Sequence, residues 1–229
     1  VCGDYPMTLL TEPTRIVLSR TQIIPAVLGE PWGGGYFAGY ISHTADGNPT
    51  HALIVAPRAT GATGVGYTLT TSLPWKTANT TTAGTTSPFD GEANTAAMVT
   101  AGIVNHPAAD FCKNLSIGGF TDWYFPARYE LDIAYFNLKP DTQLNNTTWG
   151  ANIYAVPQRN SNWTSTYPAQ TALTTFNTSA EAFVADFHWS STEASAASAW
   201  VLAINTGDQK SAFGKGTSFR VRAFRRIAL

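Results

Sequence analysis

The chain has 229 residues and a net charge of −1, and only 13% of its residues are charged, whereas 44% are hydrophobic. Globular proteins usually carry about 25% charged residues. The length allows one large domain, or one domain with an arm. No basic stripe is present for a nucleic acid, and no apolar run approaches the ~20 residues of a membrane span. We therefore expect neither a nucleic-acid partner nor membrane insertion.

The first part of the chain differs in pattern from the rest. Residues 1–29 contain short apolar runs interrupted by prolines, and the runs at 16–18 and 23–24 are typical of short strands or an extended arm. We predict an N-terminal arm for attachment or oligomerisation over residues 1–29. Residues 30–229 are then expected to form the folded domain.

Two strands and a long loop are expected next. Residues 36–41 and 51–56 are rich in aromatic and aliphatic side chains, and the turn-forming residues 45–48 between them predict a hairpin. Residues 57–90 are rich in threonine and glycine and predict a loop. We expect Trp75 to anchor that loop to the core.

The middle of the chain favours helices. A helix is expected over residues 94–101, and a second is expected to begin near Pro107 and to end near Gly118. Pro126 predicts the start of a third helix, which Leu138 and the following Lys-Pro pair end. Proline suits both starts because the first helical position needs no N–H donor.

A long polar insertion and a set of strands complete the chain. Residues 140–185 are polar, and we interpret them as an insertion. Loops of this length are usually functional or disordered. Strands are expected at 188–192, 199–204 and 219–224, with a short one at 210–213. Strands at the end and helices in the middle predict an α+β fold.

Four segments in a fixed order carry a family resemblance: Gly118–Leu131, Trp189–Glu193, Ala199–Trp200 and Phe219–Ile227. This order resembles the C-type-lectin-like domains of bacterial and phage proteins, which also occur at the C-terminus of collagen-like bacterial adhesins. Residues 33–41 and 52–57 are similar to the phage-virion branch in particular. The resemblance covers residues 30–229 and leaves residues 1–29 unmatched.

The resemblance implies a C-type-lectin-like fold with small twisted antiparallel sheets, two to three helices and long loops. It implies a non-enzymatic virion protein that is assembled in the host cytoplasm and displayed extracellularly on the virion. Its partners would be other virion proteins and a host cell-surface receptor. Two roles stay open: a tail-fibre tip or receptor-binding protein that binds a glycan or protein, and a structural component such as a capsid decoration or fibre subunit. The family favours a homo-oligomer, with a trimer preferred.

Aromatic and amide side chains in the insertion and in a later turn suit saccharide or protein recognition. The alternative is that these loops only pack against a neighbouring subunit. The candidate ligand-binding residues are Trp149, Tyr154, Asn160, Asn162, Trp163, Tyr167, Asp208, Gln209 and Lys210.

The bulky side chains in the four motif segments also have a structural interpretation. Large aromatic residues that alternate with polar ones favour the core between sheet and helices, and we expect this of Trp123, Phe125, Trp189 and Trp200. Two arginines on one face of the last strand favour a structural ion-pair network. The arginines are Arg220 and Arg222, and the expected partners are Glu130, Asp132 and Glu193.

The residue types that carry catalysis or metal binding are not arranged for it. The four histidines lack metal-ligand spacing. His188 and Ser190 share a strand with Asp186 upstream, but no strained nucleophile elbow is present. Cys2 and Cys112 are either two free thiols or one bridge. We therefore expect no catalytic residue, no metal site and no cofactor.

Overall fold

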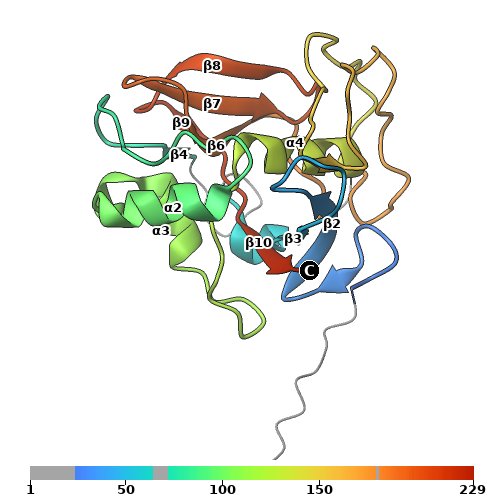
Figure 1. Cartoon of the computed structure of the whole chain (residues 1–229), viewed down its shortest axis with the longest axis horizontal. Coiled ribbons are helices and arrows are strands. Elements are labelled where there is room, and N and C mark those ends of the chain that lie inside the picture. Colours follow the sequence, from blue (N-terminus) through green and yellow to red (C-terminus); the bar gives the residue numbers. More distant parts are fainter. Residues whose placement is uncertain (1–23, 64–71, 179–180) are drawn as a thin grey trace, which may run out of the picture.

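The computed structural model describes residues 24–63, 72–178 and 181–229. Within these residues the strands form three antiparallel sheets (Figure 1). The first has the order β1-β2-β3-β10, with β5 paired to β2; the second has the order β6-β7-β8; and β4 pairs with β9. The bounds are β1 Pro31–Trp32, β2 Gly35–Ile41, β3 His51–Val55, β4 Leu73–Pro74, β5 Ala155–Val156, β6 Phe187–Glu193, β7 Ser198–Ala203, β8 Gln209–Gly214, β9 Ser218–Phe219 and β10 Phe224–Ala228.

The helices lie between and beside the sheets. α4 contacts β2 of the first sheet and also β6 and β7 of the second, so it holds the two sheets together. α2 and α3 lie next to each other on the opposite side of the molecule from the insertion (Figure 1). The fold is thus α+β, as predicted. The helices are α1 Arg58–Gly61, α2 Gly91–Thr100, the 3₁₀ helix η1 Ile103–Asn105, α3 Pro107–Lys113 and α4 Arg128–Leu138.

One buried carboxylate joins the beginnings of two helices. Glu130 Oε2 accepts hydrogen bonds from the backbone nitrogens of Ala127, at 2.7 Å, and Gly91, at 3.2 Å. Tyr124 donates its hydroxyl proton to Glu130 Oε1 at 2.6 Å. An acceptor at a helix N-terminus is favourable because the backbone N–H groups there lack partners. Residue 91 is glycine because a Cβ would lie 2.5 Å from the nitrogen of Ala127.

Most of the predicted elements are confirmed, with shifts at their ends. The hairpin of β2 and β3 and the start of α3 at Pro107 are as predicted. α3 ends at Lys113, earlier than Gly118, because Asn114 caps it. α4 begins at Arg128, two residues after Pro126.

The final strand differs from the prediction. The prediction of one strand over residues 219–224 is wrong, since β9 ends at Phe219 and β10 begins at Phe224. The residues between them cross from one sheet to the other. The nitrogen of Ala223 donates to the oxygen of Gly61, and the nitrogen of Arg220 donates to the oxygen of Phe187. The backbone of this stretch therefore hydrogen-bonds to several different segments and does not form one regular strand.

The core is rich in tryptophan. Trp123, Phe125 and Trp189 are fully buried, as predicted, and so is Trp75. The Trp75 indole donates to the oxygen of Ser190 at 2.9 Å, which confirms that it anchors the preceding loop. Trp200 was also predicted to lie in the core, but it is only half-buried, because it faces outward from β7 beneath Arg128.

The predicted ion-pair partners of the two arginines are wrong. Arg220 pairs with Asp186 and Arg222 with Glu181, both at 3.0 Å. Glu193 pairs instead with Lys215, also at 3.0 Å, and both of these side chains are buried. Of the remaining two predicted partners, Glu130 binds Tyr124 and the backbone of Ala127, and Asp132 binds residues of the insertion and of β8. The arginines find other partners because their strand is irregular and the insertion folds back beside it.

Several predictions fall beyond this description. The expected strand at 16–18 and Cys2 lie outside the described residues, and Cys112 is a buried free thiol. The domain boundary at residues 29 and 30 stays a prediction.

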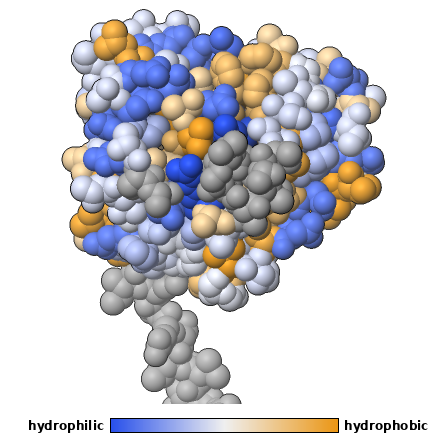
Figure 2. All heavy atoms as spheres, turned by 180° about the vertical axis from the view of Figure 1, so that it is seen from behind, coloured by the Kyte–Doolittle hydropathy of each residue, from blue (hydrophilic) through white to orange (hydrophobic). Residues whose placement is uncertain are grey.

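Seen from behind, hydrophilic and apolar side chains are interspersed over the described surface (Figure 2). In the described part of the chain, no helix has the length and apolar character to cross a membrane.

Candidate functional site

The insertion is held in place by one buried amide. Asn145 Oδ1 accepts from the Tyr135 hydroxyl at 2.5 Å and from Lys139 Nζ at 2.6 Å. Its Nδ2 donates to the backbone oxygens of Thr164 and Pro168, both at 3.0 Å. The amide thus uses both of its donors and both acceptor sites. Because Tyr135 lies on α4, the two segments of the insertion around Asn145 and Thr164 are fixed to that helix.

A buried carboxylate provides a second attachment. Asp132, also on α4, is fully buried and forms an ion pair with Arg159. It accepts hydrogen bonds from Asn152 Nδ2 at 2.8 Å and from Gln209 Nε2 at 3.2 Å. An unpaired buried charge would be costly, and these partners remove that cost. The same carboxylate therefore connects the insertion, α4 and β8.

The base of the insertion packs as part of the core. Trp163 is only 4% exposed, and its ring lies 4.8 Å from that of Tyr135, centroid to centroid. Gly207, in the turn between β7 and β8, has a φ of +67°, and a Cβ there would lie 2.5 Å from Tyr135 Cε1. Glycine is required at this turn both for its backbone conformation and for its close approach to the two rings.

A groove of about 360 Å³ lies on top of this base. The Tyr167 side chain at its edge is 60% exposed, and its ring meets Phe136 edge-on at 5.5 Å. The Arg159 guanidinium lies 4.5 Å from the centre of the Phe136 ring. The volume is within the range of small-molecule sites. The groove is lined by Phe136, Pro157, Gln158, Arg159, Asn160, Ser161, Asn162, Trp163, Thr164 and Tyr167.

Some polar side chains of the groove already form hydrogen bonds within the protein, whereas others do not. Asn162 accepts from the nitrogen of Ala151 at 3.4 Å and donates to the oxygen of Thr148 at 2.8 Å. The side chains of Asn160 and Ser161 are exposed and hydrogen-bond to no other described residue. The Asn160 amide and the Ser161 hydroxyl are therefore among the polar groups of the groove that are available to a ligand.

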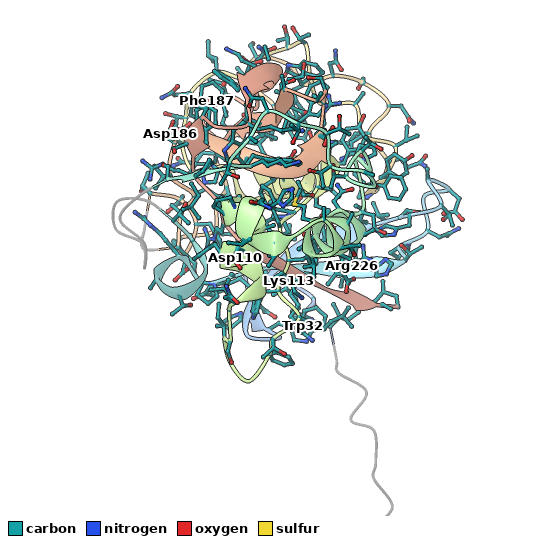
Figure 3. The ribbon with its side chains drawn as sticks, turned by 90° about the vertical axis from the view of Figure 1, so that its left-hand side faces the viewer. Trp32, Asp110, Lys113, Asp186, Phe187 and Arg226 are labelled. Carbon is teal, nitrogen blue, oxygen red and sulfur yellow. The ribbon has the colours of Figure 1, made fainter. Side chains whose placement is uncertain are left out.

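The nine candidate residues do not converge on one place. Asn160, Asn162, Trp163 and Tyr167 line the groove. Asp208 and Lys210 line a separate hollow of about 270 Å³ beside Asp186 and Phe187, which Figure 3 shows at the start of β6. The remaining three, Trp149, Tyr154 and Gln209, line neither. Gln209 is buried, and Tyr154 stacks on Phe89 at 4.2 Å.

Sequence reasoning missed an aromatic stack beside the insertion. The Arg128 guanidinium lies 3.7 Å from the centre of the Trp200 ring and 5.0 Å from that of Trp149. The Trp149 indole donates to Asp208 Oδ1 at 3.1 Å. A cation between aromatic faces is favourable. The residues are too far apart in the sequence for a local pattern to reveal this stack, although Arg128 and Trp200 both lie in the motif segments.

His188 and Ser190, for which the sequence predicts no catalytic role, both lie inside the fold. His188 is buried, its Nδ1 lies 3.1 Å from the oxygen of Asp186, and burial lowers its pKa to about 3. Ser190 is buried as well and donates to the oxygen of Trp200. Across residues 24–63, 72–178 and 181–229, no three His, Cys, Asp or Glu side chains are grouped so that they could hold a metal ion.

Neither the protein-family models nor the curated proteins contain a match to this chain.

Proposed function

We propose that the chain is a non-enzymatic binding module of the C-type-lectin-like class, displayed on a phage virion, whose groove beside Phe136 binds the host surface. The four motif segments carry the class. Small antiparallel sheets, a few helices and a long ordered insertion are compatible with it.

The observation that carries the proposal is the groove on a fixed insertion. Among the described residues between α4 and β6, only Ala155–Val156 form a strand, yet Asn145, Asp132 and Trp163 hold this segment to α4 and to the second sheet. Binding residues are often found on loops that a rigid scaffold positions. A loop that is already fixed loses little conformational entropy when a ligand binds. If the insertion had no role in binding, the conformational entropy lost in ordering this long loop would have no functional explanation.

The exposed ring of Tyr167 supports the same conclusion. Tyrosine offers a large contact area at a low cost in side-chain entropy, and its hydroxyl adds a hydrogen-bonding group. It stands next to the available side chains of Asn160 and Ser161. Aromatic, amide and hydroxyl groups together form a surface that is typical of receptor binding rather than of packing against a neighbouring subunit.

A structural role in the virion is the second candidate. Val99 at the end of α2 is 45% exposed, and Val104 in η1 is 76% exposed. The two elements α2 and η1 contact each other, and an exposed apolar patch on a surface favours contact with another protein. A particle map with many copies over the shell, contacting their neighbours through these valines, would support this candidate over receptor binding.

Binding of the labelled chain to a panel of intact bacterial strains, measured by flow cytometry, tests the first proposal. We expect binding to at least one strain and its loss in Tyr167→Ala. Val104→Ser is the control, since this side chain is exposed but lies outside the groove. Absence of binding to every strain, or equal binding by Tyr167→Ala, would contradict the proposal.

A further inference from the structure

The groove has a smaller neighbour across a ridge of the insertion. A second hollow of about 140 Å³ is lined by Lys139, Thr142, Gln143, Leu144, Ser165, Thr166, Ala169 and Gln170. Thr164 and Tyr167 line the first groove, whereas Ser165 and Thr166, which lie between them in the chain, line the second. The segment 164–167 therefore separates two depressions that open beside each other.

The two depressions share one chemistry. No Asp or Glu is among the described residues that line either of them. The Arg159 charge is paired with Asp132, and the buried Lys139 ammonium already donates to the oxygen of Gln143 and to Asn145 Oδ1. The Lys139 ammonium has no carboxylate partner among the described residues, but the side chain is only 2% exposed, so a charged ligand would have to lose its hydration before it could pair with this charge.

The groups that remain available are neutral. The hydroxyls of Thr142, Ser165 and Thr166 hydrogen-bond to no other described residue, as is the case for Asn160 and Ser161 in the first groove. Each depression also has one large hydrophobic side chain that is exposed. Tyr167 is 60% exposed in the first, and Leu144 is 65% exposed in the second. A ligand made of hydroxyl groups with apolar faces between them matches both.

We infer that the two depressions bind one neutral oligosaccharide, which crosses the ridge at residues 164–167 and places successive sugar rings against Tyr167 and Leu144. This inference rests on the proposed function and gives its ligand class. Each depression is small, at about 360 and 140 Å³, so a chain of sugars fills the pair where a single sugar fills only one. No metal ion is needed for this mode of binding, because hydroxyl and amide groups supply the contacts.

The test measures binding of the full chain to purified bacterial O-antigen polysaccharides, neutral and acidic, and to their fragments of increasing length. We expect binding to a neutral polysaccharide that strengthens when the fragments become long enough to cross the ridge. Tyr167→Ala should weaken binding of all fragments. Leu144→Ser should weaken only the long fragments, by about tenfold, and Val104→Ser should change nothing.

Different failures point to different errors. Equal binding by Leu144→Ser at every length would overturn the extended mode, and a preference for acidic polysaccharides would overturn the neutral ligand class. Binding to no polysaccharide, while Tyr167→Ala still abolishes binding to cells, would indicate a protein receptor and overturn this inference alone. Absence of cell binding would overturn the proposed function as well.

Discussion

Replacing Asn145 by alanine should release the insertion from the fold. The side chain is buried, and its amide makes four hydrogen bonds, to the Tyr135 hydroxyl, to Lys139 Nζ and to the backbone oxygens of Thr164 and Pro168. Alanine removes all four at once. The Tyr135 hydroxyl and the oxygen of Pro168 lose their partner in buried surroundings, whereas the Lys139 ammonium keeps the oxygen of Gln143 and the oxygen of Thr164 keeps the nitrogen of Tyr167.

The expected loss of stability follows from these groups. Each buried polar group left unsatisfied costs about 1–3 kcal/mol. Water can enter the space that the amide vacates and satisfy part of this demand. We therefore expect a decrease of about 3–5 kcal/mol in the free energy of unfolding, and a decrease of about 10 °C in Tm for a chain of this size.

Thermal unfolding measures the loss of stability, and native-state proteolysis shows which segment opens first. Asn145→Ala should melt earlier, and the first cleavage should fall within residues 141–175 because the insertion opens before the core does. The matched control is Asn160→Ala, which removes an exposed amide from the same insertion and should change the stability by less than about 0.5 kcal/mol. If the two variants melt alike, Asn145 is not the attachment that we infer.

Three further predictions concern other parts of the fold. Trp163→Ala should lower the free energy of unfolding by about 3–5 kcal/mol, whereas Tyr167→Ala should lower it by less than about 1 kcal/mol, as denaturant titration would show. Lys215→Met should cost about 3–5 kcal/mol in the same assay because it leaves the buried Glu193 carboxylate without its cation, and a neutral effect would contradict this. Burial lowers the pKa of His188 from 6.5 to about 3, so between these values the unfolded chain binds a proton that the folded chain does not, and stability falls as the pH falls. Between pH 6.5 and 4 this histidine contributes a loss of about 3 kcal/mol, so His188→Leu should lose about 3 kcal/mol less stability than the unchanged chain in urea titrations at the two pH values.

The sequence was a good guide wherever the determining signal is local. Pro107 marks the first turn of α3 because proline suits that position, and the turn residues 45–48 fit the hairpin of β2 and β3. The alternation of bulky and polar residues identified Trp123 and Trp189 as core. Each of these predictions depends on neighbours within a few positions of the chain.

The sequence was a poor guide wherever distant segments decide the outcome. Trp163 was expected to be an exposed binding residue, and it is buried because Gly207 and Tyr135, from two other elements, close around it. Arg222 finds Glu181 rather than a residue of the motif segments because the insertion returns beside the last strands. Periodicity cannot reveal such contacts, because it describes one element at a time.

The groove was predictable only in part, for the same reason. Asn160, Asn162 and Tyr167 belong to one polar and aromatic stretch, and that composition pointed to them. The contribution of Phe136 depends on α4 lying under the insertion, which no local pattern indicates. Asp208 and Lys210 were grouped with these residues by chemistry, but the fold places them in a different hollow.

Amide hydrogen–deuterium exchange tests the central claim most directly. The chain is measured alone and then mixed with envelope fragments from a strain to which it binds. The account predicts slower exchange in residues 158–167, around the groove, with no change in α2 and η1. Slower exchange confined to α2 and η1, with the groove unaffected, would contradict it and would place the contact surface at Val99 and Val104.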